Sequence, residues 1–271
     1  MSAAPGELGS YDPAFAGRHG PRLFRALSAY FRARVEGLEH LPEGPFLGVG
    51  NHSGGTLMPD TLLWGSGYHV LRGSPPLLVL AHDLMFDAYP RPLARALARL
   101  GALRASRERA LAALRAGFAL QVYPGGDFDA ERPFARRHQI EFAGRTGWAR
   151  LALEARVPVV PVVAIGGHET LVVLTDGRRL ARALGLDRRL RLQVVPVSLC
   201  LPFGLFVGPL PGYLPLPAQI TVRALPPLPA ERYPVGAHRD PAAVADLDAR
   251  VRAALQSCLD AMARARRPLL G

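Results

Sequence analysis

The stretch FLGVGNHSGGTLMPD, residues 46–60, decides the fold of this chain. Its first residues are apolar and predict a short buried strand, which ends in a polar, glycine-flanked loop around Asn51-His52-Ser53. Pro59 follows, and proline suits the first turn of a helix because its missing N–H is no loss there. Strand, loop and helix start place His52 at the carboxyl end of a strand, where open α/β sheets bind ligands. We therefore expect His52 to be a candidate base and Asp60 to be the acid that orients it.

A second stretch, GFALQVYPGGDFDAERP at residues 117–133, is again an apolar strand, and it breaks at Pro124-Gly125-Gly126. Residues 144–163 then predict a helix that leads into a buried strand with the sequence VPVVPVV. This alternation implies an α/β fold with a mostly parallel sheet covered by helices on both faces. In full, helices are expected at residues 22–35, 59–68, 92–100, 106–116, 146–155 and 175–193, and strands at residues 77–81, 118–123, 159–165 and 219–224.

The chain is expected to form a loose N-terminal tail, residues 1–20, and a single domain, residues 21–271. The tail contains glycine and proline and has no periodicity. The domain begins with the amphipathic helix at residues 22–35 and ends with a long helix that Asp240 and Pro241 cap. The apolar stripe of the final helix consists of Val244, Leu247, Val251, Leu255, Leu259 and Met262.

The order of these motifs resembles the glycerolipid acyltransferases of the lysophosphatidic-acid-acyltransferase superfamily. The motifs are Asn51-His52 with a following Asp, Tyr-Pro-Gly-Gly at 123–126, and Val-Pro-Val-Val-Pro at 157–161. The likeness covers about residues 46–225, and its Pro-Gly-Gly resembles the diacylglycerol-acyltransferase type. It implies a glycerolipid acyltransferase-like fold and transfer of a fatty acyl group from acyl-CoA or acyl carrier protein to a lysophospholipid or other glycerolipid hydroxyl. Beyond that acyl donor, it implies no cofactor.

By this resemblance His52 is the general base, and the acceptor attacks directly without an acyl-enzyme. The family pattern has Asp five positions after His, whereas here Leu57 stands there and Asp60 follows eight positions after His52. Eight residues of continuous helix would span about 12 Å, which is too far for contact. Gly54 and Gly55 permit a tight loop that folds His52 back toward Asp60. Taken alone, a His–Asp pair at this spacing is more often structural than catalytic.

The Pro-Gly-Gly turn lets backbone N–H groups approach a substrate closely. Phosphate-acceptor members of the superfamily carry an arginine at the corresponding turn, but Asp127 and Asp129 follow here, which argues against an acceptor phosphate. Arg145 precedes a helix start, where it either binds an anion or lies on the surface near a cap. The expected substrate-binding residues are Asn51, Ser53, Gly54, Gly55, Pro124, Gly125, Gly126 and Arg145.

Other chemistries find little support in the sequence. Histidines 69, 82, 138 and 168 lack paired metal-ligand spacing, so no metal site is expected. Gly48-x-Gly50-x-x-Ser53 lacks the third glycine of a dinucleotide fingerprint, and no Gly-x-Ser-x-Gly elbow occurs. Cys200 and Cys258 show no redox or metal spacing, which favours a reducing cytoplasmic setting.

The charge of the chain points to anionic partners. All 33 basic residues are arginine, and the net charge of +11 draws the protein to anionic lipid headgroups or to the phosphates of coenzyme A. Nucleic acid is not expected as a partner, because no recognition motif occurs and the arginines are spread along the chain. No oligomeric state follows from the sequence.

We expect a peripheral protein on the cytoplasmic face of a membrane. The N-terminus lacks the pattern of a signal peptide, and the uncharged residues 192–222 contain six prolines and three glycines, which a spanning helix would not tolerate. Three segments are candidates for lipid contact, namely the helix at residues 22–35, the arginines between 178 and 191, and the apolar residues 201–216, including Phe203, Leu205 and Phe206. Each has an ordinary alternative, which is packing on the core or solvation at the surface.

A function of another class, lipid binding without catalysis, also stays open. The unusual spacing between His52 and Asp60 also fits a non-catalytic lipid-binding protein that keeps the acyltransferase scaffold.

Overall fold

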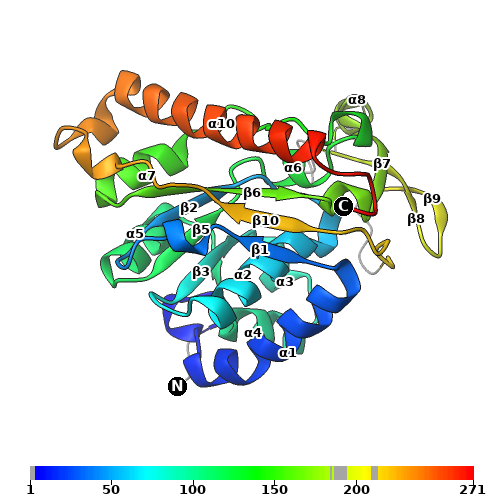
Figure 1. The fold of residues 1–271 in the computed structure, drawn as a ribbon, viewed down its shortest axis with the longest axis horizontal. Helices are drawn as coiled ribbons and strands as arrows, with labels where there is room; N and C mark the ends of the chain where they lie inside the picture. The colour runs from blue at the N-terminus through cyan, green and yellow to red at the C-terminus, as the bar shows by residue number, and fades with distance from the viewer. Residues whose placement is uncertain (1–3, 184, 186–193, 209–212) are drawn as a thin grey trace.

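The computed structural model describes residues 4–183, 185, 194–208 and 213–271. A seven-stranded sheet runs through the molecule in the order β1-β10-β6-β2-β5-β3-β4 (Figure 1). Strands β6, β2, β5, β3 and β4 are parallel to one another, β10 is antiparallel to β6, and β1 is parallel to β10. The strands are β1 (Arg34–Glu36), β2 (Leu47–Gly50), β3 (Leu77–Ala81), β4 (Ala102–Arg104), β5 (Ala119–Val122), β6 (Val159–Ile165) and β10 (Thr221–Ala224).

Helices cover both faces of this sheet, so the expected fold class is confirmed. One face carries α5 (Arg107–Arg115), α7 (Gly147–Ala155) and α10 (Pro241–Arg264), and the other carries α1 (Pro13–Phe31) and α2 (Pro59–Leu71). Alternate residues of β6 reach opposite faces, because side chains alternate along a strand: Val159 and Val163 join the first core cluster, whereas Val160 and Val162 join the second. The remaining helices are α3 (Asp83–Asp87), α4 (Arg91–Arg99), α6 (Asp127–Ala130) and α8 (Arg178–Ala183).

The N-terminal segment differs from the expectation. Helix α1 begins at Pro13, so residues 13–20 are helical rather than part of a loose tail. The physical reason is the cap at Asp12, whose side chain accepts a hydrogen bond from the N–H of Phe15. Pro21 lies inside the helix, and the helix stops at Phe31 because Arg32 adopts a left-handed conformation.

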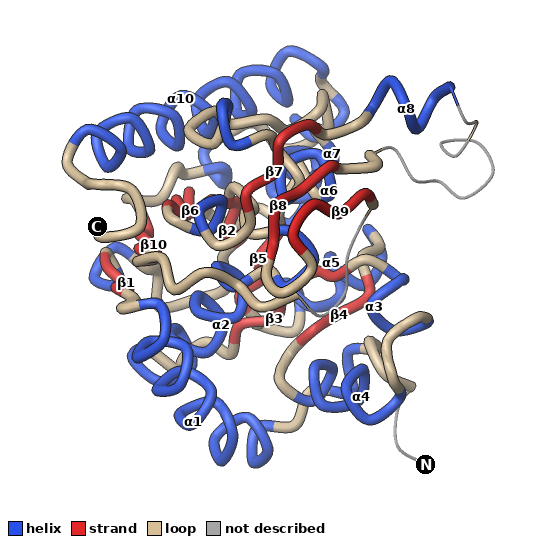
Figure 2. The backbone as a smooth tube through the Cα atoms, turned by 90° about the vertical axis from the view of Figure 1, so that its right-hand side faces the viewer, coloured by secondary structure: helices blue, strands red, loops and turns tan. Residues whose placement is uncertain are grey.

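A second sheet of three antiparallel strands was not expected from the sequence. It consists of β7 (Val172–Thr175), β8 (Val197–Cys200) and β9 (Gly204–Val207), in that order. Figure 1 draws it beyond one end of the large sheet, and Figure 2, turned to view that end, shows it in front of β2 and β5. Part of the arginine-rich segment expected to be helical at residues 175–193 forms α8, while residues 184 and 186–193 lie outside the described residues.

None of the helices in the described part of the chain combines the length and the apolar character needed to cross a membrane. The uncharged segment that looked long enough by sequence instead contains the hairpin of β8 and β9.

The final helix matches the sequence prediction closely. Asp240 caps α10 by accepting a hydrogen bond from the N–H of Ala242. The six residues of its predicted apolar stripe are all buried, and Leu255 is fully buried against the first core cluster. The helix therefore closes one face of the sheet through that stripe.

We predict that Leu255→Ala lowers the free energy of unfolding by about 3 kcal/mol, because it removes buried methyl groups and leaves a cavity. Urea unfolding measures the change. The same substitution at Leu93 of α4, which is 46% exposed, is the control and should change stability by less than about 0.5 kcal/mol. Equal losses in the two variants would show that α10 is not anchored by this stripe.

Candidate active site

His52 and Asp60 are in contact and buried. The imidazole Nδ1 of His52 lies 3.3 Å from Oδ2 of Asp60 and 3.2 Å from the hydroxyl of Thr61. His52 is 6% exposed and Asp60 is 1% exposed. His52 lies two residues after the end of β2 at Gly50, so it stands at the carboxyl end of a central parallel strand. The structure therefore brings together the two residues expected to form the catalytic pair.

The loop between them returns on itself, as Gly54 and Gly55 were expected to permit. Gly54 and Gly55 have φ angles of +85° and +60°, and Met58 is also left-handed at 46°. A Cβ on Gly54 would lie 2.6 Å from Cδ of Pro59, and one on Gly55 would lie 2.5 Å from Leu171. A side chain at either position would therefore be both strained and crowded. This compact loop brings residues eight positions apart into contact before α2 starts at Pro59.

Asp60 is held by hydrogen bonds from the surrounding chain. Its Oδ2 accepts from the backbone N–H of Ser53 at 2.8 Å and from the Ser53 hydroxyl at 3.2 Å. Its Oδ1 accepts from the N–H of Thr61 at 2.8 Å. A carboxylate fixed in this way favours the imidazole tautomer with its proton on Nδ1. That tautomer leaves Nε2 of His52 as the basic nitrogen.

Tyr123 fixes the plane of the imidazole. Its ring stacks on His52 with 4.5 Å between centroids and an angle of 20° between planes. Burial, followed by the charge of Asp60, raises the pKa of Tyr123 well above its usual range, so the phenol is neutral. Tyr123 immediately precedes the Pro-Gly-Gly turn, which therefore lies next to His52.

Asp129 connects the two loops and was not recognised as a site residue from the sequence. Its Oδ2 accepts a hydrogen bond of 2.5 Å from the backbone N–H of His52. Its other oxygen forms an ion pair with Arg132, and both side chains are fully buried. Burial lowers the pKa of Arg132 to about 10, which still leaves its guanidinium charged at neutral pH. A local signal existed in the acid and the arginine spaced three positions apart, but nothing in it indicated His52 as the partner.

The Pro-Gly-Gly turn is held from outside by Arg145. The guanidinium donates to the carbonyls of Pro124 and Gly125 at 3.2 and 3.0 Å and pairs with Asp127 at 3.2 Å. The Gly126 N–H is used within the turn, where it donates to the carbonyl of Tyr123. Arg145 thus positions the turn, and an anion would have to displace these contacts.

The side chains of two further predicted substrate-binding residues, Asn51 and Ser53, form hydrogen bonds within the protein. The side-chain amide of Asn51 donates to the carbonyl of Ala164 at 2.8 Å and accepts from its N–H at 2.9 Å, which joins the end of β2 to β6. Ser53 is occupied by Asp60, as described above. Substrate binding by these residues stays a prediction.

Two buried titratable side chains near the loop were missed as parts of the site. Glu131 is 5% exposed, and its Oε2 has no hydrogen-bond partner. Burial raises the pKa of Glu131 to about 7. His168 is 5% exposed on the turn after β6, and burial lowers its pKa well below the usual range, so the imidazole is neutral. Within the described ranges, no group of three or more His, Cys, Asp or Glu side chains is arranged to hold a metal ion.

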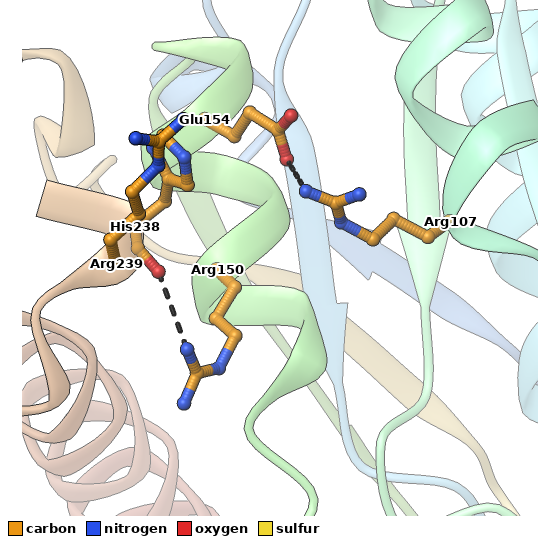
Figure 3. Close-up of a pocket in the computed structure, with 5 residues that line it drawn as sticks. All are labelled: Arg107, Arg150, Glu154, His238 and Arg239. Carbon is orange, nitrogen blue, oxygen red and sulfur yellow. Dashed lines mark hydrogen bonds and ion pairs between the residues drawn. The ribbon is translucent and has the colours of Figure 1, made fainter. Parts of the chain in front are cut away.

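A surface pocket of about 480 Å³ lies elsewhere, beside α5 and α7. Figure 3 shows its lining of three arginines, one glutamate and one histidine, with Arg107 paired to Glu154 and Arg150 donating to the carbonyl of His238. It shares no residue with the predicted site.

Comparison with known proteins agrees with this geometry. The family model described as Acyltransferase matches residues 32–165, which include His52, Asp60 and the Pro-Gly-Gly turn. The 1-acyl-sn-glycerophosphate (LPA) acyltransferase PlsC from Thermotoga maritima has a similar fold, with a TM-score of 0.55, 17% identity, and coverage of 94% of this chain and 80% of that chain. The resemblance stated from the sequence is therefore confirmed: residues 32–165 match the Acyltransferase model, and the fold is similar to that of the Thermotoga maritima protein.

Several curated proteins also match this chain. Uncharacterized proteins of Mycobacterium tuberculosis and Mycobacterium leprae are each 29% identical over 249 residues, which is 91% of this chain and 66% and 64% of those proteins. This chain thus spans just under two thirds of their length. A DGAT1/2-independent enzyme synthesizing storage lipids from Gallus gallus is 28% identical over 183 residues, 65% of this chain and 52% of that protein.

We predict that Asp129→Asn lowers the free energy of unfolding by about 3–5 kcal/mol, because it leaves the buried Arg132 cation without a countercharge. Urea unfolding measures the loss. Asp127→Asn is the matched control, since Asp127 is a partly exposed acid with an arginine partner, and it should lose less than about 1 kcal/mol. A loss at Asp129 no larger than that at Asp127 would contradict the structural role of the buried pair.

We predict that Glu131→Gln changes the pH dependence of stability. The folded pKa of Glu131, about 7, lies above its ordinary 4.5, so the folded state binds more protons between these values and the wild type loses stability as pH rises through this window. The loss amounts to roughly 3 kcal/mol and should be absent in the glutamine variant. Unfolding in urea at pH 5 and pH 8 measures it. Parallel pH curves for the two proteins would show that Glu131 is not buried as a carboxyl.

Proposed function

We propose that this chain, whose residues 32–165 belong to the Acyltransferase family, transfers a fatty acyl group from a thioester donor to the hydroxyl of a glycerolipid. The donor in this proposal is acyl-CoA or acyl carrier protein, and the acceptor is a lysophospholipid or another glycerolipid. The observation that carries the proposal is the buried contact between His52 and Asp60 at the carboxyl end of β2.

The proposed reaction starts with proton transfer to His52. With Nδ1 directed to Asp60, Nε2 accepts the proton of the acceptor hydroxyl as its oxygen attacks the thioester carbonyl. Asp60 keeps the ring oriented and stabilises the imidazolium that forms. Collapse of the tetrahedral intermediate breaks the C–S bond, and the imidazolium returns the proton to the leaving thiolate. No acyl-enzyme forms, and the ester product leaves with the thiol.

The developing oxyanion needs hydrogen-bond donors close to His52. The backbone N–H of Gly125 is our candidate, because Pro124 has no N–H and the Gly126 N–H is used within the turn. Tyr123 joins this turn to the imidazole, and Arg145 holds the turn in place. Gly125 is required there for space, since a Cβ would lie 2.4 Å from both Asp129 and the carbonyl of Glu141. A rigid turn of this kind orients its dipoles before the reaction starts.

The charges around the site favour an acceptor without a phosphomonoester. Arg145 pairs with Asp127, Arg132 pairs with Asp129, and Glu131 lies buried nearby. A phosphate at this turn would therefore meet carboxyl groups and compete for cations that are already paired. Mono- and diacylglycerols are the acceptors to test first, with lysophospholipids beside them.

The alternative, a non-catalytic lipid-binding protein, rested on the unusual spacing of Asp60. The contact at 3.3 Å removes that reason, because the loop brings the acid to His52 as a shorter spacing would.

We further propose that the protein works as a peripheral protein at the cytoplasmic face of a membrane. Its lipid acceptors lie in the bilayer, and a net charge of +11 attracts it to anionic headgroups.

We predict that His52→Ala lowers turnover at least about 100-fold, because the general base is lost. Asp60→Asn should lose less, since it removes only the charge that orients the imidazole. Labelled acyl-CoA and acyl carrier protein, each offered with lysophospholipids, monoacylglycerol and diacylglycerol, measure transfer, and thermal unfolding checks that the variants fold. His40→Ala is the control for a partly exposed histidine on the same protein. Near-normal turnover of His52→Ala would refute the mechanism, and no transfer by the wild type to any acceptor would favour the lipid-binding alternative.

A further inference from the structure

An apolar patch covers the three-stranded sheet. Among the described residues, fifteen large hydrophobic side chains are exposed, and seven of them gather on this sheet and the segments next to it. No charged residue occurs between positions 194 and 218. The patch consists of Leu174, Leu199, Leu201, Phe203, Leu205, Val207 and Leu214, which are between 49% and 64% exposed.

The sheet is apolar on both of its faces. Cys200 and Val173 pack inward with Leu171 and Tyr213 in a small buried cluster. Phe206, which the sequence suggested for insertion, is partly buried against this cluster. On the outer face Leu199 stands opposite Leu205. An antiparallel sheet whose second face meets water normally carries polar residues there. A contiguous apolar outer face instead marks a surface that meets an apolar partner.

The patch is attached to the candidate active site. The hydroxyl of Tyr213 donates to the carbonyl of Gly54, and Leu57 of the same loop packs on the inner cluster. Leu171, which precedes β7, occupies the space beside Gly55. Figures 1 and 2 place the sheet at the end of the molecule where β2 and β5 finish. A partner that meets the patch therefore meets the edge of the catalytic loop.

The other two segments considered for lipid contact are less suited to it. The apolar side of α1 is already used, because Phe24, Leu27 and Phe31 pack in the second core cluster. Arg178 is neutralised by Glu141 and Asp176. Much of the remaining arginine-rich segment lies outside the described residues. Within the part of the chain that the structure describes, the three-stranded sheet thus carries the largest group of exposed apolar side chains.

We propose that the patch on β7–β9 inserts into the hydrocarbon region of a lipid bilayer and holds the His52 loop against the membrane surface. Two observations favour a bilayer over a second copy of the chain. The patch is entirely uncharged, while α8, which follows β7, carries the exposed Arg182, so apolar and basic surfaces adjoin as they do in interfacial proteins. A second copy seated on the patch would also lie against the catalytic loop, which must stay open to lipid. This second reason rests on the proposed acyl transfer.

Vesicle binding by the full chain tests the proposal. Phe203→Glu/Leu205→Glu should bind vesicles of phosphatidylcholine, with or without phosphatidylglycerol, at least tenfold more weakly than the wild type in a flotation assay. Leu93→Glu/Val235→Glu, which places the same charges on exposed apolar residues elsewhere, should bind like the wild type. Raising the salt concentration should weaken binding to the anionic vesicles without abolishing it, because insertion of apolar side chains is not screened. Equal binding by the two double variants would overturn the proposal.

A fluorescent variant gives a second readout that does not depend on losing binding. Leu205→Trp should show a blue-shifted emission with vesicles and should be quenched by lipids brominated on their acyl chains. An emission that brominated lipids leave unquenched would overturn the proposal. The proposal would also be overturned if the wild type did not bind vesicles but formed a dimer, measured by light scattering, that became monomeric when the patch was substituted.

Activity separates this inference from the proposed function. If both hold, Phe203→Glu/Leu205→Glu should lose at least tenfold more activity on a vesicle-embedded acceptor than on a soluble short-chain acceptor. If the wild type transfers no acyl group but its vesicle binding depends on the patch, the proposed function fails and the membrane surface stands. If acyl transfer proceeds while the patch variant binds vesicles normally, the proposed function stands and the membrane surface proposed here fails.

Discussion

A fully buried carboxylate, that of Asp129, joins the two loops from which the site is built. It accepts the backbone N–H of His52 on one side and pairs with the buried guanidinium of Arg132 on the other. Burying an unpaired carboxylate is strongly unfavourable, so the ion pair with Arg132 offsets the cost of placing this acid at such a depth. Because Asp129 stands three residues after Gly126, the same contact also sets the distance between His52 and the Pro-Gly-Gly turn. The two loops therefore behave as one unit.

A second constraint extends from this unit to the surface. The left-handed residues of the loop bring Asp60 to His52, and the carbonyl of Gly54 then faces the hydroxyl of Tyr213. Through that bond and the packing of Leu57, the loop is continuous with the inner cluster of the three-stranded sheet. The outer face of the same sheet is apolar. Contact of this face with lipid would thus act on the loop through side chains that already touch it.

Local pattern accounts for most of the large sheet and for the loop that joins His52 to Asp60, but not for the contacts between that loop and distant segments. The strands at 77–81 and 159–165 agree with their predicted bounds, because continuous apolar runs between turn residues are typical of buried parallel strands. The three-residue strands β1 and β4 were missed, since such short pieces have no period of their own. The hairpin of β8 and β9 was hidden by the prolines around it. Asp129 was missed for another reason: its partner His52 is 77 positions away, and no local pattern records such a contact.

The paired charges at the site and the apolar surface beside it both favour the proposed neutral glycerolipid acceptor. Arg132 and Arg145 stand where an anionic acceptor would need free cations, yet each is bound to an acid of the segment that follows the Pro-Gly-Gly turn. Glu131 adds a carboxyl that burial keeps largely protonated up to about neutral pH, with its pKa raised to about 7. A neutral glycerolipid brings no charge into these pairs, and its acyl chains would lie in the hydrocarbon that the apolar patch is suited to meet. An acceptor phosphate, by contrast, would have to break an ion pair close to His52, and the two loops that hold His52 in place depend on the pair between Asp129 and Arg132.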